Sequence, residues 1–130
     1  VYEGIALSLL DCYDTMGVPV TELRLAGGGA RSGLWAQILA DALGCHVMVA
    51  DGQEYGAKGA IINAGVAAGV YASYADGVAR TVRAARHFAP DPARREDYAV
   101  LLQVYRSVRE AMLPVWEQRA QLLQRFTESI

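Results

Sequence analysis

Three consecutive glycines, Gly27, Gly28 and Gly29, follow a short apolar run and precede a helix-like segment. Glycines at the end of a buried strand let the backbone approach a ligand without interference from side chains. The start of the next helix supplies N–H groups without partners and a positive dipole end, and both favour a phosphate. Arg31 adds a permanent charge. The pattern predicts a phosphate-binding turn, with a ligand-free tight turn as the alternative.

The type of phosphate ligand is constrained by the residues after the glycines. A Walker A motif is absent, because no Gly-Lys-Ser/Thr follows them. A Rossmann-type dinucleotide site is a competing interpretation, since Gly27 and Gly29 follow a strand and Asp51 ends the next one. The third glycine of the Rossmann fingerprint is missing, because Ser32 occupies that position and Gly33 comes one residue late. A dinucleotide-binding domain therefore stays open as an alternative.

Other polar residues give weaker indications of chemistry. Asp51 and Glu54 could pair as acid and base, but a solvated loop is the favoured interpretation. Trp35 has the helical spacing of a core residue rather than a base-stacking one. Ser8 and Ser32 have no histidine at a readable spacing, so nucleophilic catalysis is not supported. The sequence predicts no catalytic residue.

Composition excludes several classes of protein. The 130 residues are 53% hydrophobic and 20% charged with a net charge of −2, which argues against disorder and gives no electrostatic basis for binding nucleic acid or an acidic membrane. Cys12 and Cys45 lack companions at zinc spacing, which favours reduced thiols in a cytoplasmic protein. His46 and His87 are isolated in apolar runs, so no metal ligand is predicted.

The order of expected elements is that of an α/β fold with parallel strands joined by crossover helices. Two strands alone do not make a stable sheet, so further strands are expected from residues outside this sequence. The first residue is not Met and a helix begins at once without a cap, which also predicts a piece of a longer protein. Helices are expected up to Met16, over 32–43, over 57–70 (nearly buried), near 73–79 and from about 94 past 123 with a kink or break at Pro114; strands are expected over 23–26 and 46–50, and a strand or extended segment over 82–88.

Residues 3 to about 74 resemble the FGGY family of carbohydrate kinases. The resemblance lies in EGIA at 3–6, LAGGGARSGLWAQ at 25–37, ADALG at 40–44, EYGAKGA at 54–60, AGVA at 64–67 and GVY at 69–71, in order and at family spacing. The last 40 or so residues are similar only in being helical. Lys58 stands where many members of the family carry leucine, and Ser32 where glycerol kinases carry asparagine. Both departures favour xylulokinase-like kinases of ketopentoses, related sugars or polyols over glycerol kinases.

The resemblance implies an actin-like (ribonuclease H-like) ATPase fold, with residues 1–130 as part of its C-terminal, nucleotide-binding domain. ATP and Mg²⁺ are the implied cofactors, with Gly27, Gly28 and Gly29 against the α-phosphate and ribose, Arg31 beside them and Ser32 near the adenine. The reaction is phosphorylation of a sugar or polyol hydroxyl. The catalytic aspartate and most sugar contacts are expected upstream, so the isolated chain should be inactive. A cytoplasmic enzyme, as a monomer or homodimer, fits this family; a non-catalytic interaction fragment is the other alternative.

Overall fold

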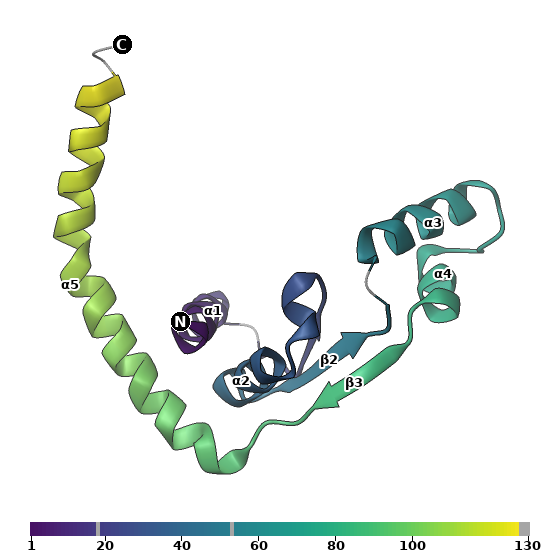
Figure 1. The fold of residues 1–130 in the computed structure, drawn as a ribbon, viewed down its shortest axis with the longest axis horizontal. Helices are drawn as coiled ribbons and strands as arrows, with labels where there is room; N and C mark the ends of the chain where they lie inside the picture. The colour runs from purple at the N-terminus through teal and green to yellow at the C-terminus, as the bar shows by residue number, and fades with distance from the viewer. Residues whose placement is uncertain (18, 53, 128–130) are drawn as a thin grey trace.

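The centre of the chain is a mixed β-sheet (Figure 1). The computed structural model describes residues 1–17, 19–52 and 54–127. Within these residues the sheet has three strands in the order β1 (Glu22–Leu25), β2 (His46–Ala50) and β3 (Ala84–Phe88). β1 pairs in parallel with β2, and β2 pairs antiparallel with β3.

The parallel pair of β1 and β2 confirms the predicted crossover. The two strands pair from Glu22 with His46 to Leu25 with Val49, and α2 (Gly33–Leu43) connects them. Such a connection returns the chain in the same direction on the neighbouring strand. Gly44 ends α2 with a φ of 62°, in the left-handed conformation that favours glycine at a helix end.

β3 corrects one expectation and confirms another. Not all strands of the sheet are parallel, because β3 runs antiparallel to β2. The segment over 82–88, expected as a strand or extended segment, forms a strand at residues 84–88, while further strands from outside this sequence stay a prediction. The chain leaves β2 through α3 (Tyr55–Ala67) and α4 (Tyr74–Thr81) without crossing the sheet, so it re-enters from the same end and runs antiparallel. Figure 1 shows these two helices beyond that end.

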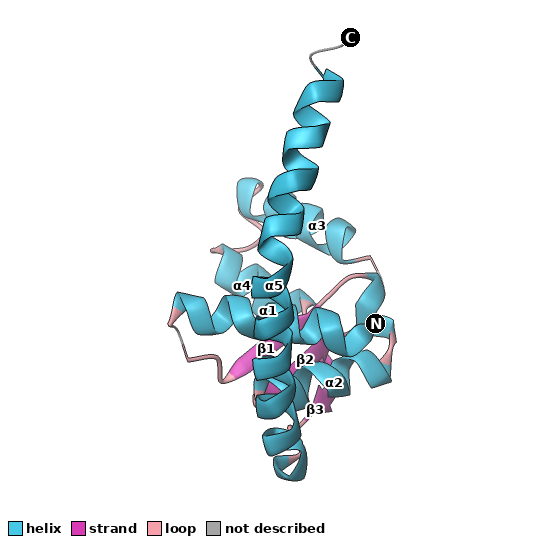
Figure 2. Ribbon diagram, turned by 90° about the vertical axis from the view of Figure 1, so that its left-hand side faces the viewer, coloured by secondary structure: helices cyan, strands magenta, loops and turns pink. Residues whose placement is uncertain are grey.

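The core lies on one face of the sheet, where helices are stacked in layers (Figures 1 and 2). α2 packs on β2 and β3, α1 (Tyr2–Met16) packs on α2, and α5 (Arg95–Thr127) packs on both helices. Leu39 of α2 and Val47 of β2 are fully buried between these layers, with Tyr98 and Leu102 of α5 at the outer edge.

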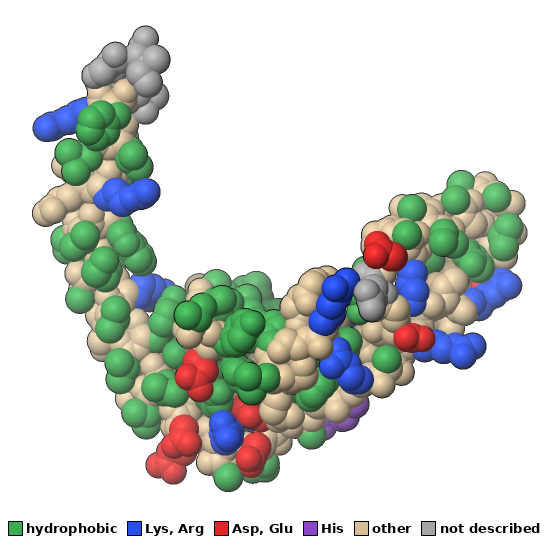
Figure 3. All heavy atoms as spheres, in the orientation of Figure 1, with side chains coloured by type: hydrophobic (Ala, Val, Ile, Leu, Met, Phe, Trp, Pro, Cys, Tyr) green, Lys and Arg blue, Asp and Glu red, His purple; other side chains and the backbone are tan. Residues whose placement is uncertain are grey.

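Within the described residues, the opposite face of the sheet is not covered by a layer of helices, so β2 is buried on one face only. His46 is exposed and Met48 half-buried, whereas Val47 and Val49, which point to the other side, are buried. His46 stacks on His87 with ring centroids 4.8 Å apart, and both histidines lie on the outer surface (Figure 3). These two histidines, which are isolated in sequence, are neighbours in the fold.

α3 is far less buried than its small residues predicted. Of its described residues, Ile62 alone is buried, because the helix packs on α4 rather than on the sheet. Gly65 of α3 makes room for an aromatic ring, since a Cβ there would overlap the ring of Tyr71 in the loop between α3 and α4.

α5 is a single helix that includes Pro114, so the predicted break is not observed (Figure 1). Asp91 begins the 3-10 turn η2 (Pro92–Arg94) before it, and its side chain accepts a hydrogen bond from the Ala93 N–H at 2.9 Å, as a capping residue does. The second half of α5 extends away from the sheet. Among the described helices, none combines the length and apolar character that a membrane crossing needs.

Candidate functional site

The glycine turn lies where the two parallel strands end. β1 runs into Gly27 and the 3-10 turn η1 (Gly28–Arg31), while β2 runs into Asp51 and Gly52. The carboxyl ends of neighbouring parallel strands meet at one edge, and open α/β sheets bind ligands outside this edge. The fold thus brings together two loops that are about 20 residues apart in sequence.

The backbone conformation of the turn is fixed by Gly27 and Ala30. Gly27 has φ 86° and ψ −169°, a conformation that is essentially restricted to glycine. The Gly27 carbonyl accepts a hydrogen bond from the Ala30 N–H at 3.1 Å, and the Ala30 side chain, 1% exposed, is part of the core. The turn therefore has a defined position relative to the sheet before any ligand binds.

The other two glycines have different surroundings. A Cβ on Gly29 would lie 3.2 Å from Cδ1 of Trp35, so a side chain there would press on the indole ring. Trp35 packs against the core and lies 5.5 Å from the ring of Tyr2, which confirms its structural role. A Cβ on Gly28 would meet no atom within 4 Å. Gly28, like Gly27, therefore leaves open space beside the turn, and its φ is not positive.

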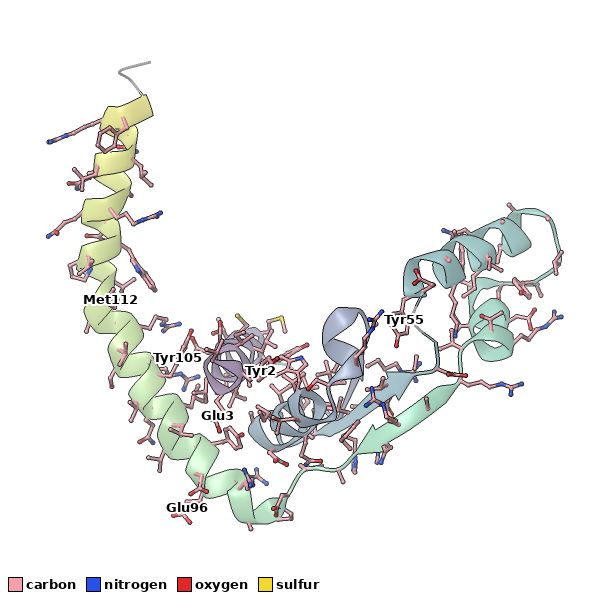
Figure 4. All side chains as sticks on the ribbon, viewed as in Figure 1. Tyr2, Glu3, Tyr55, Glu96, Tyr105 and Met112 are labelled. Atoms are coloured by element: carbon pink, nitrogen blue, oxygen red, sulfur yellow. The ribbon has the colours of Figure 1, made fainter. Side chains whose placement is uncertain are left out.

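An open hollow of about 480 Å³ lies beside this turn and is formed by three stretches of chain. The turn, the segment after β2 and strand β3 line it with Gly27, Gly28, Arg31, Asp51, Gly52, Tyr55 and Arg86. Tyr55 lies between the start of α3 and the turn (Figure 4), and its hydroxyl donates to the Ala50 carbonyl at 3.0 Å. Basic side chains gather on this part of the surface (Figure 3).

Of the five predicted site residues, three line the hollow and two do not. Gly27, Gly28 and Arg31 contribute to its wall. Ser32 instead caps α2, because its Oγ accepts a hydrogen bond from the Trp35 N–H at 3.2 Å. Gly29 lies against Trp35. Gly29 and Ser32 therefore contact Trp35 of α2 and support the turn on the side away from the hollow.

Asp51 is in the hollow, as both the dinucleotide and the acid–base interpretations require, but Glu54 does not line it. The Asp51 N–H donates to the Arg83 carbonyl at 2.7 Å, and the Asp51 carbonyl accepts from Nζ of Lys58. The Lys58 side chain therefore fixes the loop after β2. The structure does not bring the two carboxylates together as lining residues.

Arg86 is the site residue that the sequence did not indicate. Its guanidinium group donates hydrogen bonds to the carbonyls of Ala30 and Arg31, the latter at 3.4 Å. No local pattern marks this residue, because its partners lie 55 and 56 residues earlier in the chain. Tyr55 lies in the segment 54–60, which carries part of the family resemblance, but nothing in that segment indicated that Tyr55 lines the hollow.

The lining residues suit binding rather than bond breaking. Arg31 and Arg86 supply positive charge, the turn supplies backbone N–H groups, and Asp51 is the one carboxylate among the described lining residues. In the described part of the chain, no group of three or more His, Cys, Asp or Glu side chains is placed to hold a metal ion. The residues present therefore do not form a Mg²⁺ site by themselves.

Residues 1–68 match the sequence profile of the C-terminal domain of the FGGY family of carbohydrate kinases. The match covers the glycine turn, Asp51 and Tyr55, and ends before Arg86. It thus includes most of the lining of the hollow.

Two similar proteins are named kinases of small polar molecules. The erythritol kinase of Brucella abortus (strain 2308) is 39% identical over 122 residues, which are 92% of this chain and 24% of the relative. An autoinducer-2 kinase of Escherichia coli (strain K12) is 40% identical over 93 residues, or 72% of this chain and 18% of the relative. The chain thus spans at most about a quarter of the length of these two relatives.

Solved structures share the fold. The xylulose kinase from Rhodospirillum rubrum matches with a TM-score of 0.74 and 27% identity, over 89% of this chain and 24% of that protein. The gluconate kinase from Lactobacillus acidophilus matches with a TM-score of 0.77 over 86% of this chain and 23% of that protein; at 22% identity it supports the fold alone. Sequence profile, relatives and fold agree, and the chain belongs to the FGGY family of carbohydrate kinases.

Proposed function

We propose that this chain forms the nucleotide-binding part of a kinase that transfers a phosphoryl group from ATP to a hydroxyl of a sugar or polyol. One observation carries the proposal: the hollow at the carboxyl ends of the parallel strands is lined by Gly27, Gly28 and Arg31. The turn that forms this wall lies within the region that matches the family profile. An actin-like ATPase domain, to which residues 1–130 contribute, is the fold that we propose for the whole enzyme.

Each predicted residue has a place in this proposal. Gly27 and Gly28 let the nucleotide approach the backbone at its α-phosphate and ribose, and Arg31 adds charge. Gly29 and Ser32 act indirectly, since one accommodates Trp35 and the other begins α2. Because Ser32 caps α2 and does not line the hollow, we assign it to the shape of the adenine end rather than to a direct hydrogen bond.

The catalytic base and most of the sugar site are assigned to the remainder of the kinase. Phosphoryl transfer depends on positioning and charge neutralisation, and the residues of the hollow serve the first of these by holding the nucleotide. The described residues do not fit a Mg²⁺ site of their own, so no step is assigned to the ion here.

Two alternatives are less well supported. A Rossmann-type domain would use Asp51 to bind a ribose hydroxyl, and Asp51 does line the hollow, but the similar proteins are kinases. A non-catalytic interaction fragment would need no such hollow. The free thiols of Cys12 and Cys45 fit the reducing cytoplasm that we propose for the enzyme, and monomer or homodimer assembly is compatible with this proposal.

Equilibrium titration of the full-length kinase that contains this segment separates these alternatives. We expect the kinase to bind ATP and ADP but not NAD(H). Asp51→Ala should change the affinity for ATP and ADP little. Binding of NAD(H) that disappears in Asp51→Ala, without binding of ATP, would establish the dinucleotide interpretation instead. Absence of binding to either nucleotide would favour the interaction fragment.

A further inference from the structure

Arg86 links a strand outside the family match to the glycine turn. It lies on β3, while the turn follows β1, two strands away in the sheet. Its guanidinium group donates one hydrogen bond to the Ala30 carbonyl and a second, at 3.4 Å, to the Arg31 carbonyl. Both carbonyls are at the C-terminal end of η1, where backbone oxygens lack partners within the turn.

The position of the Arg86 side chain is itself fixed. Its guanidinium carbon lies 5.8 Å from the centroid of the Phe88 ring, within range of a cation–π contact. Phe88 packs against the core and lies close to Gly33, the first residue of α2. The guanidinium group is therefore held against the turn, although Arg86 as a residue is exposed.

The geometry of the contacts requires an arginine. A planar guanidinium group presents several N–H donors in a rigid fork and reaches two adjacent carbonyls at once, whereas a lysine ammonium is a compact charge on a flexible stem. Hydrogen bonds from a charged donor are also stronger than neutral ones. Arg86 therefore ties down the end of the turn, while Gly27 and the core side chain of Ala30 fix its beginning and middle.

We propose that Arg86 is a positioning residue for nucleotide binding, which acts by holding the glycine turn in its binding conformation. This inference rests on the proposed ATP site. Although Arg86 lines the hollow, its hydrogen bonds go to the backbone carbonyls of Ala30 and Arg31, and we assign its effect on the nucleotide to the backbone of Gly27 and Gly28, which these bonds hold in place. The part of the nucleotide that contacts this turn is shared by AMP, ADP and ATP.

This mechanism makes a specific prediction about nucleotide length. Loss of Arg86 should weaken the binding of AMP, ADP and ATP by the same factor, because each nucleotide presents the same α-phosphate and ribose to the turn. A residue that contacted the β- or γ-phosphate directly would instead weaken ATP more than AMP. Because Arg86 acts through the turn, we expect only part of the free energy of its two bonds to appear as lost affinity, namely about a tenfold weakening, which is about 1.4 kcal/mol.

The test compares Arg86→Gln, Arg86→Lys and the control Arg24→Gln in the full-length kinase that contains this segment. Arg24 lies on β1 with its side chain 78% exposed and paired with Glu22, away from the hollow. Calorimetric titration with AMP, ADP and ATP gives the affinities, steady-state kinetics give KM and kcat, and thermal melting reports folding.

For Arg86→Gln we expect about a tenfold rise in Kd for all three nucleotides and in KM for ATP, with kcat at saturating ATP and KM for the sugar within about twofold of wild type. Arg86→Lys should show a smaller rise, and Arg24→Gln none. If Arg86→Gln does not fold, Arg86→Lys carries the same comparison. Wild-type affinity in both Arg86 variants, or a loss that grows from AMP to ATP, overturns the inference. A wild-type enzyme that binds no ATP refutes the proposed function instead.

Discussion

Arg106 of α5 donates a hydrogen bond through Nε to Oδ1 of Asp11 on α1, at 2.7 Å and across 95 residues of sequence. Arg109 bonds the second oxygen of the same carboxylate, and Arg106 also reaches Asp14 at 2.9 Å. The Asp11 side chain is only 9% exposed. The hydrogen bond from Arg106 lowers the pKa of Asp11, burial opposes this, and the charge of Arg109 lowers it further.

Replacing Asp11 with Asn should destabilise the packing of α1 on α5. The variant leaves two guanidinium groups facing a neutral amide, and loss of one partner from a largely buried ion pair is destabilising. We expect a lower melting temperature at pH 7 for Asp11→Asn. Asp14→Asn is the matched control, because Asp14 is half exposed and makes one of these bonds; its melting temperature should fall less. Equal effects of the two variants would contradict the assignment.

The contribution of Asp11 should also depend on pH. Because its folded-state pKa is lowered, folding favours the ionised form, so the stabilisation is complete above the unfolded pKa, about 3.9, and is lost as the pH falls through the folded pKa. The difference in unfolding free energy between wild type and Asp11→Asn should therefore be constant from pH 7 to about 5 and shrink below about pH 4. Urea denaturation across this range measures it; a difference that grows with acidity would show the opposite sign.

Gly77 of α4 should tolerate no side chain. A Cβ there would lie 2.8 Å from Cγ2 of Ile62 and 3.1 Å from the ring of Tyr71. Gly77→Ala should destabilise the α3–α4 pair, because overpacking costs about 1–3 kcal/mol, whereas the higher helix propensity of alanine returns about 1 kcal/mol or less. Native-state hydrogen exchange measures this effect, and the amides of α3 should exchange faster in Gly77→Ala than in wild type.

Gly59 of α3 is the control for this substitution. A Cβ at Gly59 would meet no atom within 4 Å, so Gly59→Ala should slow exchange in α3 or leave it unchanged. Slower exchange in both variants would show that Gly77 is not sterically restricted.

The parallel pair of strands and the glycine turn were predictable because their signals are local. An apolar run, a glycine-rich turn and one amphipathic helix fix the direction of β2 relative to β1 through the handedness of the crossover. The turn conformation follows from Gly27, whose φ of 86° glycine alone adopts readily.

The sequence did not predict features that depend on distant contacts. It left open whether residues 82–88 form a strand or an extended segment and did not indicate their antiparallel pairing, because β3, exposed at Ala84, Ala85, Arg86 and His87, lacks the alternation that marks a half-buried strand. Arg86 shows its role only when its partners 55 and 56 residues away are in place. α3 has the small residues typical of close packing, but among its glycines only Gly65 lies against another side chain, the ring of Tyr71.

The 130-residue chain alone should not phosphorylate sugars. Among the described residues that line the hollow, Asp51 carries the one carboxylate, and its loop is held by the backbone contacts of Arg83 and Lys58. An ADP-release assay with a panel of pentuloses and polyols, including erythritol, checks this expectation, with a full-length FGGY kinase as positive control. Turnover above background would show that the chain carries its own catalytic base.

Gly28→Val tests the glycine turn in the full-length kinase. A valine at this position meets no protein atom at Cβ, and φ at Gly28 is not positive, so the substitution should leave the fold intact. Its branched side chain would occupy space beside the turn that the nucleotide needs. Loss of one or two hydrogen bonds to a charged phosphate costs about 1–3 kcal/mol each, so KM for ATP should rise tenfold or more while KM for the sugar changes little.

Two substitutions make this result interpretable. Gly4→Val on α1 also places its Cβ in open space, far from the turn in sequence, and should leave KM for ATP unchanged. Gly27→Val forces a branched residue into a conformation with φ 86°, so it should lower the melting temperature as well as the affinity. The glycine turn is therefore identified as the nucleotide site by a loss of ATP affinity in Gly28→Val at wild-type stability. Wild-type KM for ATP in a folded Gly28→Val enzyme would place the nucleotide elsewhere.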